Sequence, residues 1–241
     1  MNYTPSAINA LAFEQHASVE DDEDDAGGVG GGSAAAAAVA PKPTRLAISR
    51  ANGDIELWNV SHDWHLERFI RGGEDASVES IAWANGRLFS AGLHSTVTEY
   101  DLKTLMPKAS VDSFGGPVWT IAINHAGTVL AAGCEDGCVK LFDIEDGRLE
   151  YVRSLDKQEG RVLAVAWHED DEIIVAGGAD STIRVLVAET GRTRLRITLG
   201  STPDAATLVW SVCVLKDMTI VSGDSRGKCL YQTKTTTTNL R

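Results

Sequence analysis

Short apolar runs separated by polar turns make up most of this chain, and three such runs with their turns form a unit that recurs five times. The clearest copy passes from Val118–Ile123 through Val129–Gly133 and a polar turn at Asp136-Gly137 to Val139–Ile144. Runs of this length that are rich in β-branched and aromatic residues are typical of β-strands. The pattern therefore predicts an all-β chain assembled from one repeated group of strands.

The length of the repeat indicates the architecture. Successive copies of the tight turn lie 42, 42, 44 and 46 residues apart, at Gly53, Ser95, Gly137, Ser181 and Gly227. The pairs Asn52-Gly53 and Asp136-Gly137 suit the positive φ angles of a hairpin turn. A period of about 40–45 residues is typical of WD repeats, each of which forms one four-stranded blade of a β-propeller. We predict an all-β WD-repeat propeller with about five repeats.

Each repeat opens with an apolar strand, and these five strands align with one another. They are Ile8–Phe13, Val78–Trp83, Val118–Ile123, Val162–Trp167 and Val209–Val214. Their β-branched and aromatic residues suit strands that are buried on both faces between blades. We expect their Trp and Phe side chains to belong to the core.

Certain positions recur at fixed places in the repeat. Five residues after the turn, three repeats carry an aromatic residue followed by Asn or Asp, which resembles the Trp-Asp ending of WD repeats. Carboxylates beside the turn commonly bond turn amides. We predict structural roles, not catalytic ones, for these repeat positions: Trp58, Tyr100, Phe142, Asp136, Asp180 and Trp119. Trp119 is expected to be a buried core residue.

The sequence offers little for catalysis or metal binding. Cys134, Cys138, Cys213 and Cys229 lack CxxC spacing, which favours buried, reduced thiols over a zinc site. None of the six histidines has HExxH spacing. No run of 18 apolar residues could span a membrane, and the N-terminus does not resemble a secretory signal. We predict a protein that is not an enzyme, with no cofactor, no metal, no membrane contact and no small-molecule substrate.

Charge and composition divide the chain further. The net charge is −12, of which the acidic run at 20–25 supplies −6; such a chain has little attraction for bare nucleic acid. Residues 18–43 combine that run with glycine and alanine tracts, which predicts a disordered insert. We expect residues 1–17 to begin the first repeat, 44–228 to form the blades and 229–241 to be an atypical tail. Seven blades need roughly 300 residues, so an incomplete propeller is favoured over a five-bladed closure or half of an assembly.

Several strings resemble one particular family. Leu88–Leu93 with Glu99–Leu102 is similar to the second repeat of the cirhin family, and Asp112–Trp119 to the start of its third repeat. The resemblance runs from Asn2 to about Lys228 and leaves out 18–43. Cirhin proteins are longer WD-repeat proteins of the nucleolar small-subunit processome with two tandem propellers, so the resemblance implies an N-terminal fragment.

The resemblance also implies a function. It points to a non-enzymatic scaffold in ribosome biogenesis that supports processing of the small-subunit rRNA and has a link to rDNA transcription. Its location would be the nucleus and nucleolus, and its partners other processome proteins and, indirectly, the pre-rRNA ribonucleoprotein. The alternatives are a generic WD adaptor, such as a ubiquitin-ligase substrate receptor, and a propeller enzyme. If a contact site exists, the loops Arg71–Ser77 and Lys108–Pro117 are expected to form it.

Overall fold

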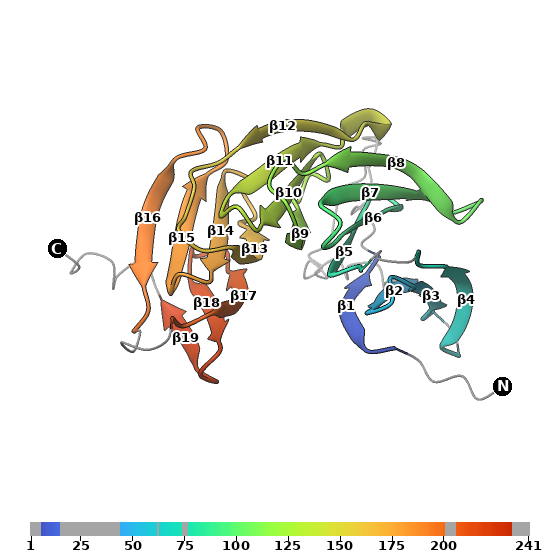
Figure 1. The fold of residues 1–241 in the computed structure, drawn as a ribbon, viewed down its shortest axis with the longest axis horizontal. Coiled ribbons are helices and arrows are strands. Elements are labelled where there is room, and N and C mark those ends of the chain that lie inside the picture. Colours follow the sequence, from blue (N-terminus) through green and yellow to red (C-terminus); the bar gives the residue numbers. More distant parts are fainter. Residues whose placement is uncertain (1–5, 15–43, 62, 74–76, 201–205, 233–241) are drawn as a thin grey trace, which may run out of the picture.

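A computed structural model describes residues 6–14, 44–61, 63–73, 77–200 and 206–232 of the chain. Within these ranges the strands form five antiparallel sheets that follow one another in chain order along a curved row (Figure 1). The predicted all-β class and the propeller-like arrangement of WD repeats are confirmed. The predicted insert at 18–43 lies outside the described residues.

Four sheets have four strands and the last has three. Their bounds are β1 Ile8–Phe13, β2 Arg45–Arg50, β3 Ile55–Asn59, β4 His65–Ile70; β5 Ser80–Ala84, β6 Arg87–Ala91, β7 Thr96–Asp101, β8 Met106–Asp112; β9 Val118–Ile123, β10 Val129–Cys134, β11 Val139–Asp143, β12 Glu150–Ser154; β13 Val162–Trp167, β14 Ile173–Gly178, β15 Thr182–Val187, β16 Thr193–Thr198; β17 Val209–Val214, β18 Ile220–Asp224 and β19 Cys229–Gln232. Four of the five predicted opening strands have the predicted bounds, and the second begins two residues late, at Ser80.

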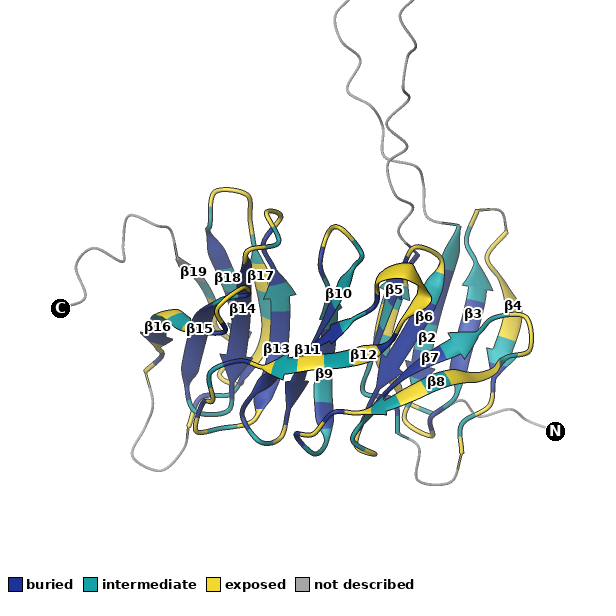
Figure 2. Cartoon of the chain, turned by 90° about the horizontal axis from the view of Figure 1, so that it is seen from above, coloured by how far each residue is buried: buried dark blue, intermediate teal, exposed yellow. Residues whose placement is uncertain are grey.

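Strands are added to each sheet in sequence order, and each pairs antiparallel to the one before. The turn between the second and third strands and the segment that leads into the next sheet therefore lie at the same end of the sheets. We call this end the upper face and the opposite end the lower face. Figure 2 shows buried residues along the inner strands and exposed residues on the outer strands β4, β8 and β12.

Four apolar clusters fill the spaces between neighbouring sheets, one for each of the four interfaces. Two tryptophans at the same place in their repeats also bridge neighbouring sheets with hydrogen bonds. Trp83 Nε1 donates to the carbonyl oxygen of Ala12 at 3.1 Å, and Trp167 Nε1 donates to that of Ala122 at 3.2 Å. Both tryptophans are buried, as predicted, and each satisfies its only polar atom within the interface.

Glycines in the second strand of a repeat allow the next sheet to pack closely. A Cβ atom on Gly133 would lie 2.7 Å from Val162 Cγ1, and one on Gly177 would lie 2.5 Å from Val209 Cγ1. The equivalent glycine of the last sheet, Gly223, would meet only Ser211 Cβ, at 3.9 Å. Glycine therefore recurs at this position because the first strand of the next sheet packs directly against it. In the described residues no such strand covers Gly223.

The two ends of the row depart from the prediction that every opening strand is buried on both faces. On β1, Leu11 is 58% exposed and Phe13 is 47% exposed, and on β17 Trp210 is 53% exposed. Figure 1 shows β1–β4 and β17–β19 at opposite ends of the row. Within the described residues, each end strand packs against only one neighbouring sheet. The expectation therefore holds for the inner sheets and is wrong at the ends.

The cysteines also differ in burial between an inner sheet and the last sheet. Cys134 and Cys138 are both buried. Cys134 belongs to the apolar cluster between the second and third sheets, where burial raises its pKa to about 12. Cys213 and Cys229 are exposed, so the prediction of buried thiols is wrong for these two. Both belong to the last sheet, where one face of the sheet has no neighbour within the described residues.

The predicted boundary of the repeats after Lys228 falls inside a hairpin. β19 pairs with β18 from Gly223↔Cys229 to Ile220↔Gln232, so the last sheet continues through Gln232. The aromatic-Asp ending is not needed for this pairing because backbone groups make the ladder hydrogen bonds. Residues 233–241 of the predicted tail lie outside the described part.

Candidate interaction surface on the upper face

The loop between β8 and β9 holds an exposed aromatic side chain in a fixed position. Phe114 is 63% exposed and has a φ of +54°. Asp112 Oδ1 accepts a hydrogen bond from the Phe114 amide at 2.6 Å, and Ser113 Oγ donates to the Gly116 carbonyl oxygen at 2.8 Å. A Cβ on Gly115 would lie 2.7 Å from Cys134 Cβ, so only glycine fits there without a shift. The loop presents Phe114 to solvent at low cost in conformational entropy.

Beside this loop, Trp119 forms a stacked polar cluster at the start of β9. Its Nε1 donates to Glu135 Oε2 at 2.7 Å, and the Arg161 guanidinium lies 5.0 Å from its ring centroid. Arg161 Nη1 lies 3.6 Å from Glu135 Oε2. Trp119 is half-buried, so the prediction that it is a buried core residue is wrong. Its ring covers the upper face, because Val118 and Ile121 fill the core faces of β9.

Asp136 follows Glu135 in the turn between β10 and β11, and its carboxylate holds that turn in place. Asp136 Oδ1 accepts a hydrogen bond from the Cys138 amide at 2.9 Å, and Oδ2 lies 2.7 Å from Lys140 Nζ. Burial of Lys140 opposes its charged form, but the hydrogen bond and the charge of Asp136 outweigh this and raise the pKa of Lys140. Asp180 occupies the equivalent place in the fourth sheet, where Oδ1 accepts from the Thr182 amide at 3.1 Å.

The three aromatic repeat positions lie near the ends of their third strands, away from the upper face. Phe142 is fully buried, whereas Trp58 and Tyr100 are half-buried. Trp58 Nε1 donates to Glu56 Oε2 at 2.9 Å, and the Tyr100 hydroxyl pairs with Ser90 Oγ at 3.0 Å. Of the six predicted repeat positions, the structure brings together only Trp119 and Asp136, through the turn that contains Glu135.

The described residues contain no group of three or more His, Cys, Asp or Glu side chains placed to hold a metal ion. In the same part of the chain, no helix is long and apolar enough to cross a membrane. The features that stand out are instead exposed apolar side chains on the upper face, namely Leu93, Phe114 and Trp210. Sequence reasoning singled out the loop Lys108–Pro117 but not Phe114, because only the fold shows that its ring lies exposed beside Tyr151.

This arrangement of sheets and turns defines a class of protein. The family model described as "WD domain, G-beta repeat" matches residues 108–143 and 149–185. Each match runs from the outer strand of one sheet to the third strand of the next, from β8 to β11 and from β12 to β15. These two matches place WD repeats within a row of five consecutive blade-like sheets.

Comparison with known proteins narrows the class. The chain is 34% identical over 95% of its length to the human U3 small nucleolar RNA-associated protein 4 homolog, and covers 30% of that protein. It is 38% identical over 94% of its length to U3 small nucleolar RNA-associated protein 4 of Schizosaccharomyces pombe, of which it covers 31%. U3 small nucleolar RNA-associated protein 4 is also called cirhin, so these comparisons support the resemblance to the cirhin family.

A weaker similarity connects the chain to a relative with a different name. The Arabidopsis thaliana protein named Cell division cycle 20.1, cofactor of APC complex, is 26% identical over 71% of the chain, which covers 39% of it. The chain thus spans about three tenths of the length of the U3-associated relatives.

Proposed function

We propose that this chain acts as part of a non-enzymatic scaffold protein in ribosome biogenesis, in the small-subunit processome of the nucleolus. The observation that carries the proposal is the identity of 34–38% to U3 small nucleolar RNA-associated protein 4 from human and yeasts, in alignments that cover 94–96% of the chain. Its partners are other processome proteins, and its contact with the pre-rRNA ribonucleoprotein is indirect.

The geometry of the upper face supports a scaffold role. Phe114 offers an exposed ring, and the Trp119–Glu135–Arg161 cluster next to it is held by hydrogen bonds and stacking. Rigid aromatic and Arg side chains are the residues that dominate protein–protein contacts. The net charge of −12 favours protein partners over bare RNA.

The alternative is a WD adaptor of another assembly, such as a ubiquitin-ligase substrate receptor. The similarity to a cofactor of the APC complex favours it, at lower identity and over less of the chain. Location in the cell separates the two functions, because a processome scaffold accumulates in the nucleolus and a general adaptor does not.

The test is to tag the chain at its own locus, image it beside a nucleolar marker, and identify copurifying proteins by mass spectrometry. A Phe114→Ser variant, which removes the exposed ring and its edge-to-face contact with Tyr151, is purified in parallel. We expect nucleolar signal, enrichment of processome proteins, and loss of part of that set with the variant. A diffuse signal with enrichment of ubiquitin-ligase subunits would overturn the proposal in favour of the adaptor.

A further inference from the structure

Two interfaces between sheets contain a buried ion pair that the interface between the first and second sheets lacks. Three residues after the turn, the third strand carries Lys140 in the third sheet and Arg184 in the fourth, both at most 9% exposed. Each lies within 4 Å of the Asp four residues before it, as Asp136–Lys140 at 2.7 Å and Asp180–Arg184 at 3.8 Å. A long buried cation and its carboxylate therefore occupy the space that faces the preceding sheet.

The second sheet has neither member of this pair. The equivalent positions are His94 and Thr98. Lys140 Nζ donates to Ser154 Oγ at 2.9 Å, and Thr98 Oγ1 makes the matching bond with Ser110 Oγ at 2.9 Å. The strand pairing is thus the same, but the side chain is several atoms shorter.

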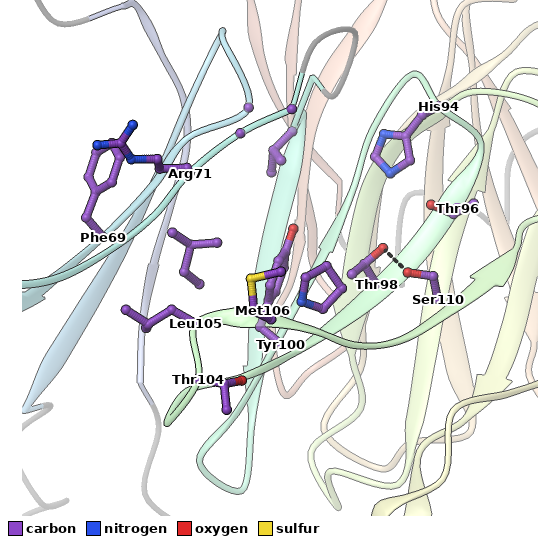
Figure 3. Close-up of a pocket in the computed structure, with 16 residues that line it drawn as sticks. Phe69, Arg71, His94, Thr96, Thr98, Tyr100, Thr104, Leu105, Met106 and Ser110 are labelled. Atoms are coloured by element: carbon purple, nitrogen blue, oxygen red, sulfur yellow. Dashed lines mark hydrogen bonds between the residues drawn. The ribbon is translucent and has the colours of Figure 1, made fainter.

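A groove of about 530 Å³ lies where the cation is missing, between β4 and the β7–β8 hairpin. This volume is within the range of about 300–1,000 Å³ seen for ligand sites. Figure 3 shows the groove, with His94 and Arg71 in its upper half and Thr104 and Leu105 at its lower end. It follows the length of β7, whose six residues span about 20 Å.

The lining combines an apolar floor with a positive upper end. Phe69, Tyr100, Leu105 and Met106 supply the apolar surface, and Met106 is 61% exposed. Arg71 and His94 are exposed at the upper end. Among the described residues, no Asp or Glu lines the groove, although the chain has 34 acidic residues and a net charge of −12. The site therefore favours an occupant that is apolar at one end and anionic at the other.

We propose that this groove binds an extended linear peptide of a partner protein, with a bulky apolar side chain against Met106 and Leu105 and an Asp or Glu toward Arg71. The length of the groove and the exposure of its walls suit a strand-like segment rather than an enclosed small molecule. Methionine and tyrosine adapt to apolar side chains of different shape. The inference concerns a site apart from the upper-face cluster and does not depend on the assembly to which the chain belongs.

The test uses the full 241-residue chain, immobilised, and a phage library of random linear dodecapeptides. Synthetic versions of the enriched peptides are then titrated against variants. His94→Asp with Thr98→Lys rebuilds the Asp–Lys pair of the third sheet and fills the groove, while Met106→Asp places a charge on its floor. Val152→Glu, at an exposed site on β12, is the control.

We expect enriched peptides to share a bulky apolar residue with an Asp or Glu a few residues away. Binding should weaken at least tenfold in the double variant and in Met106→Asp, weaken severalfold in Arg71→Ala, and stay within twofold in Val152→Glu. The proposal is overturned if no sequence is enriched, if the peptides lack an acidic residue, or if both groove variants bind them normally. Displacement of the peptides by a single-stranded RNA oligomer at equal concentration would also overturn it in favour of a nucleic-acid site.

Discussion

The Glu99 carboxylate lies almost entirely out of water, between two cations. It is 2% exposed, Arg87 donates to both of its oxygens at 3.0 and 2.7 Å, and Lys108 Nζ donates to Oε1 at 2.8 Å. Burial opposes ionisation, but the hydrogen bonds from Arg87 and Lys108 outweigh it and lower the pKa of Glu99. Because the folded-state pKa is below the ordinary value of 4.5, the ionised carboxylate stabilises the fold above that value, and this stabilisation is lost as the pH falls through the folded-state pKa.

We therefore predict that Glu99→Gln lowers the free energy of unfolding at pH 7 by about 3 kcal/mol, since it leaves a partly buried arginine without its charged partner. It should also flatten the loss of stability between pH 6 and pH 3. Urea denaturation followed by tryptophan fluorescence measures both. Glu150→Gln, an exposed carboxylate on β12, is the control and should change stability by less than about 0.5 kcal/mol. Equal effects of the two variants would contradict the buried network.

The glycines of the second strands give a matched pair of variants. In Gly177→Ala the new Cβ would lie 2.5 Å from Val209 Cγ1, whereas in Gly223→Ala its nearest neighbour would be Ser211 Cβ at 3.9 Å. We expect Gly177→Ala to cost about 1–3 kcal/mol through overpacking and Gly223→Ala to change stability by less than about 0.5 kcal/mol. The same denaturation assay checks this. A comparable cost at both positions would mean that the last glycine is covered as the others are.

For individual residues, the sequence predicts the place in the repeat better than it predicts what surrounds the side chain. The turns and the core aromatics Trp83 and Trp167 follow from periodicity, because both tryptophans occupy the same place in the opening strands of their repeats. Trp119 has the same residue type in an inner strand, yet its ring is half-buried beside Arg161. Its partner Glu135 belongs to a different strand pair, and spacing along the chain does not show which residues meet at the upper face.

At the scale of elements, the last two sheets are joined by a titratable contact. His168, in the turn after β13, lies 2.9 Å from Asp170 Oδ2 through Nδ1 and 3.3 Å from the Lys216 carbonyl oxygen through Nε2. Burial opposes protonation, but the hydrogen bonds to Asp170 and to the Lys216 carbonyl outweigh it and raise the pKa of His168. Lys216 belongs to the turn between β17 and β18, so the imidazolium attaches the last sheet to the fourth.

The sign of this shift sets the pH dependence. Because the folded-state pKa exceeds the ordinary value of 6.5, the stabilisation is fully present below 6.5 and is lost as the pH rises through the folded-state value. We predict stronger amide hydrogen-exchange protection of β17 and β18 at pH 6 than at pH 8, after correction for intrinsic exchange. His168→Asn should remove the difference, while the inner sheet β9–β12 serves as an internal control. Unchanged protection of β17 and β18 between the two pH values would contradict this coupling.

The elements also show why the groove could not be found from the strand pattern alone. The alignment of the repeats places Thr98 with Lys140 and Arg184, and this difference is visible in the sequence. Its consequence is not, because a shorter side chain opens a groove only where the neighbouring strand, here β4, does not fill the space. Repeat alignment thus indicates where sheets differ, and packing decides whether the difference leaves a surface for binding.

At the scale of the whole molecule, the chain is an open row of sheets that presents loops on one face and outer strands along its rim. Exposed apolar residues at both ends, such as Leu11 and Trp210, and the fixed aromatic loop at Phe114 give it several surfaces for other proteins. Surfaces of this kind suit assembly better than chemistry. The number of repeats and the class of protein were predicted from the sequence, whereas the location of the contact surfaces required the fold.

The most direct test of the central claim is to purify the chain, tagged at its own locus, and quantify the RNA that accompanies it. U3 small nucleolar RNA and small-subunit pre-rRNA are measured against an unrelated small nuclear RNA, with an untagged strain as background. A processome scaffold predicts strong enrichment of both U3 and pre-rRNA over the unrelated RNA. Recovery of U3 at the level of the unrelated RNA, from a chain that is expressed and folded, would contradict the assignment to ribosome biogenesis.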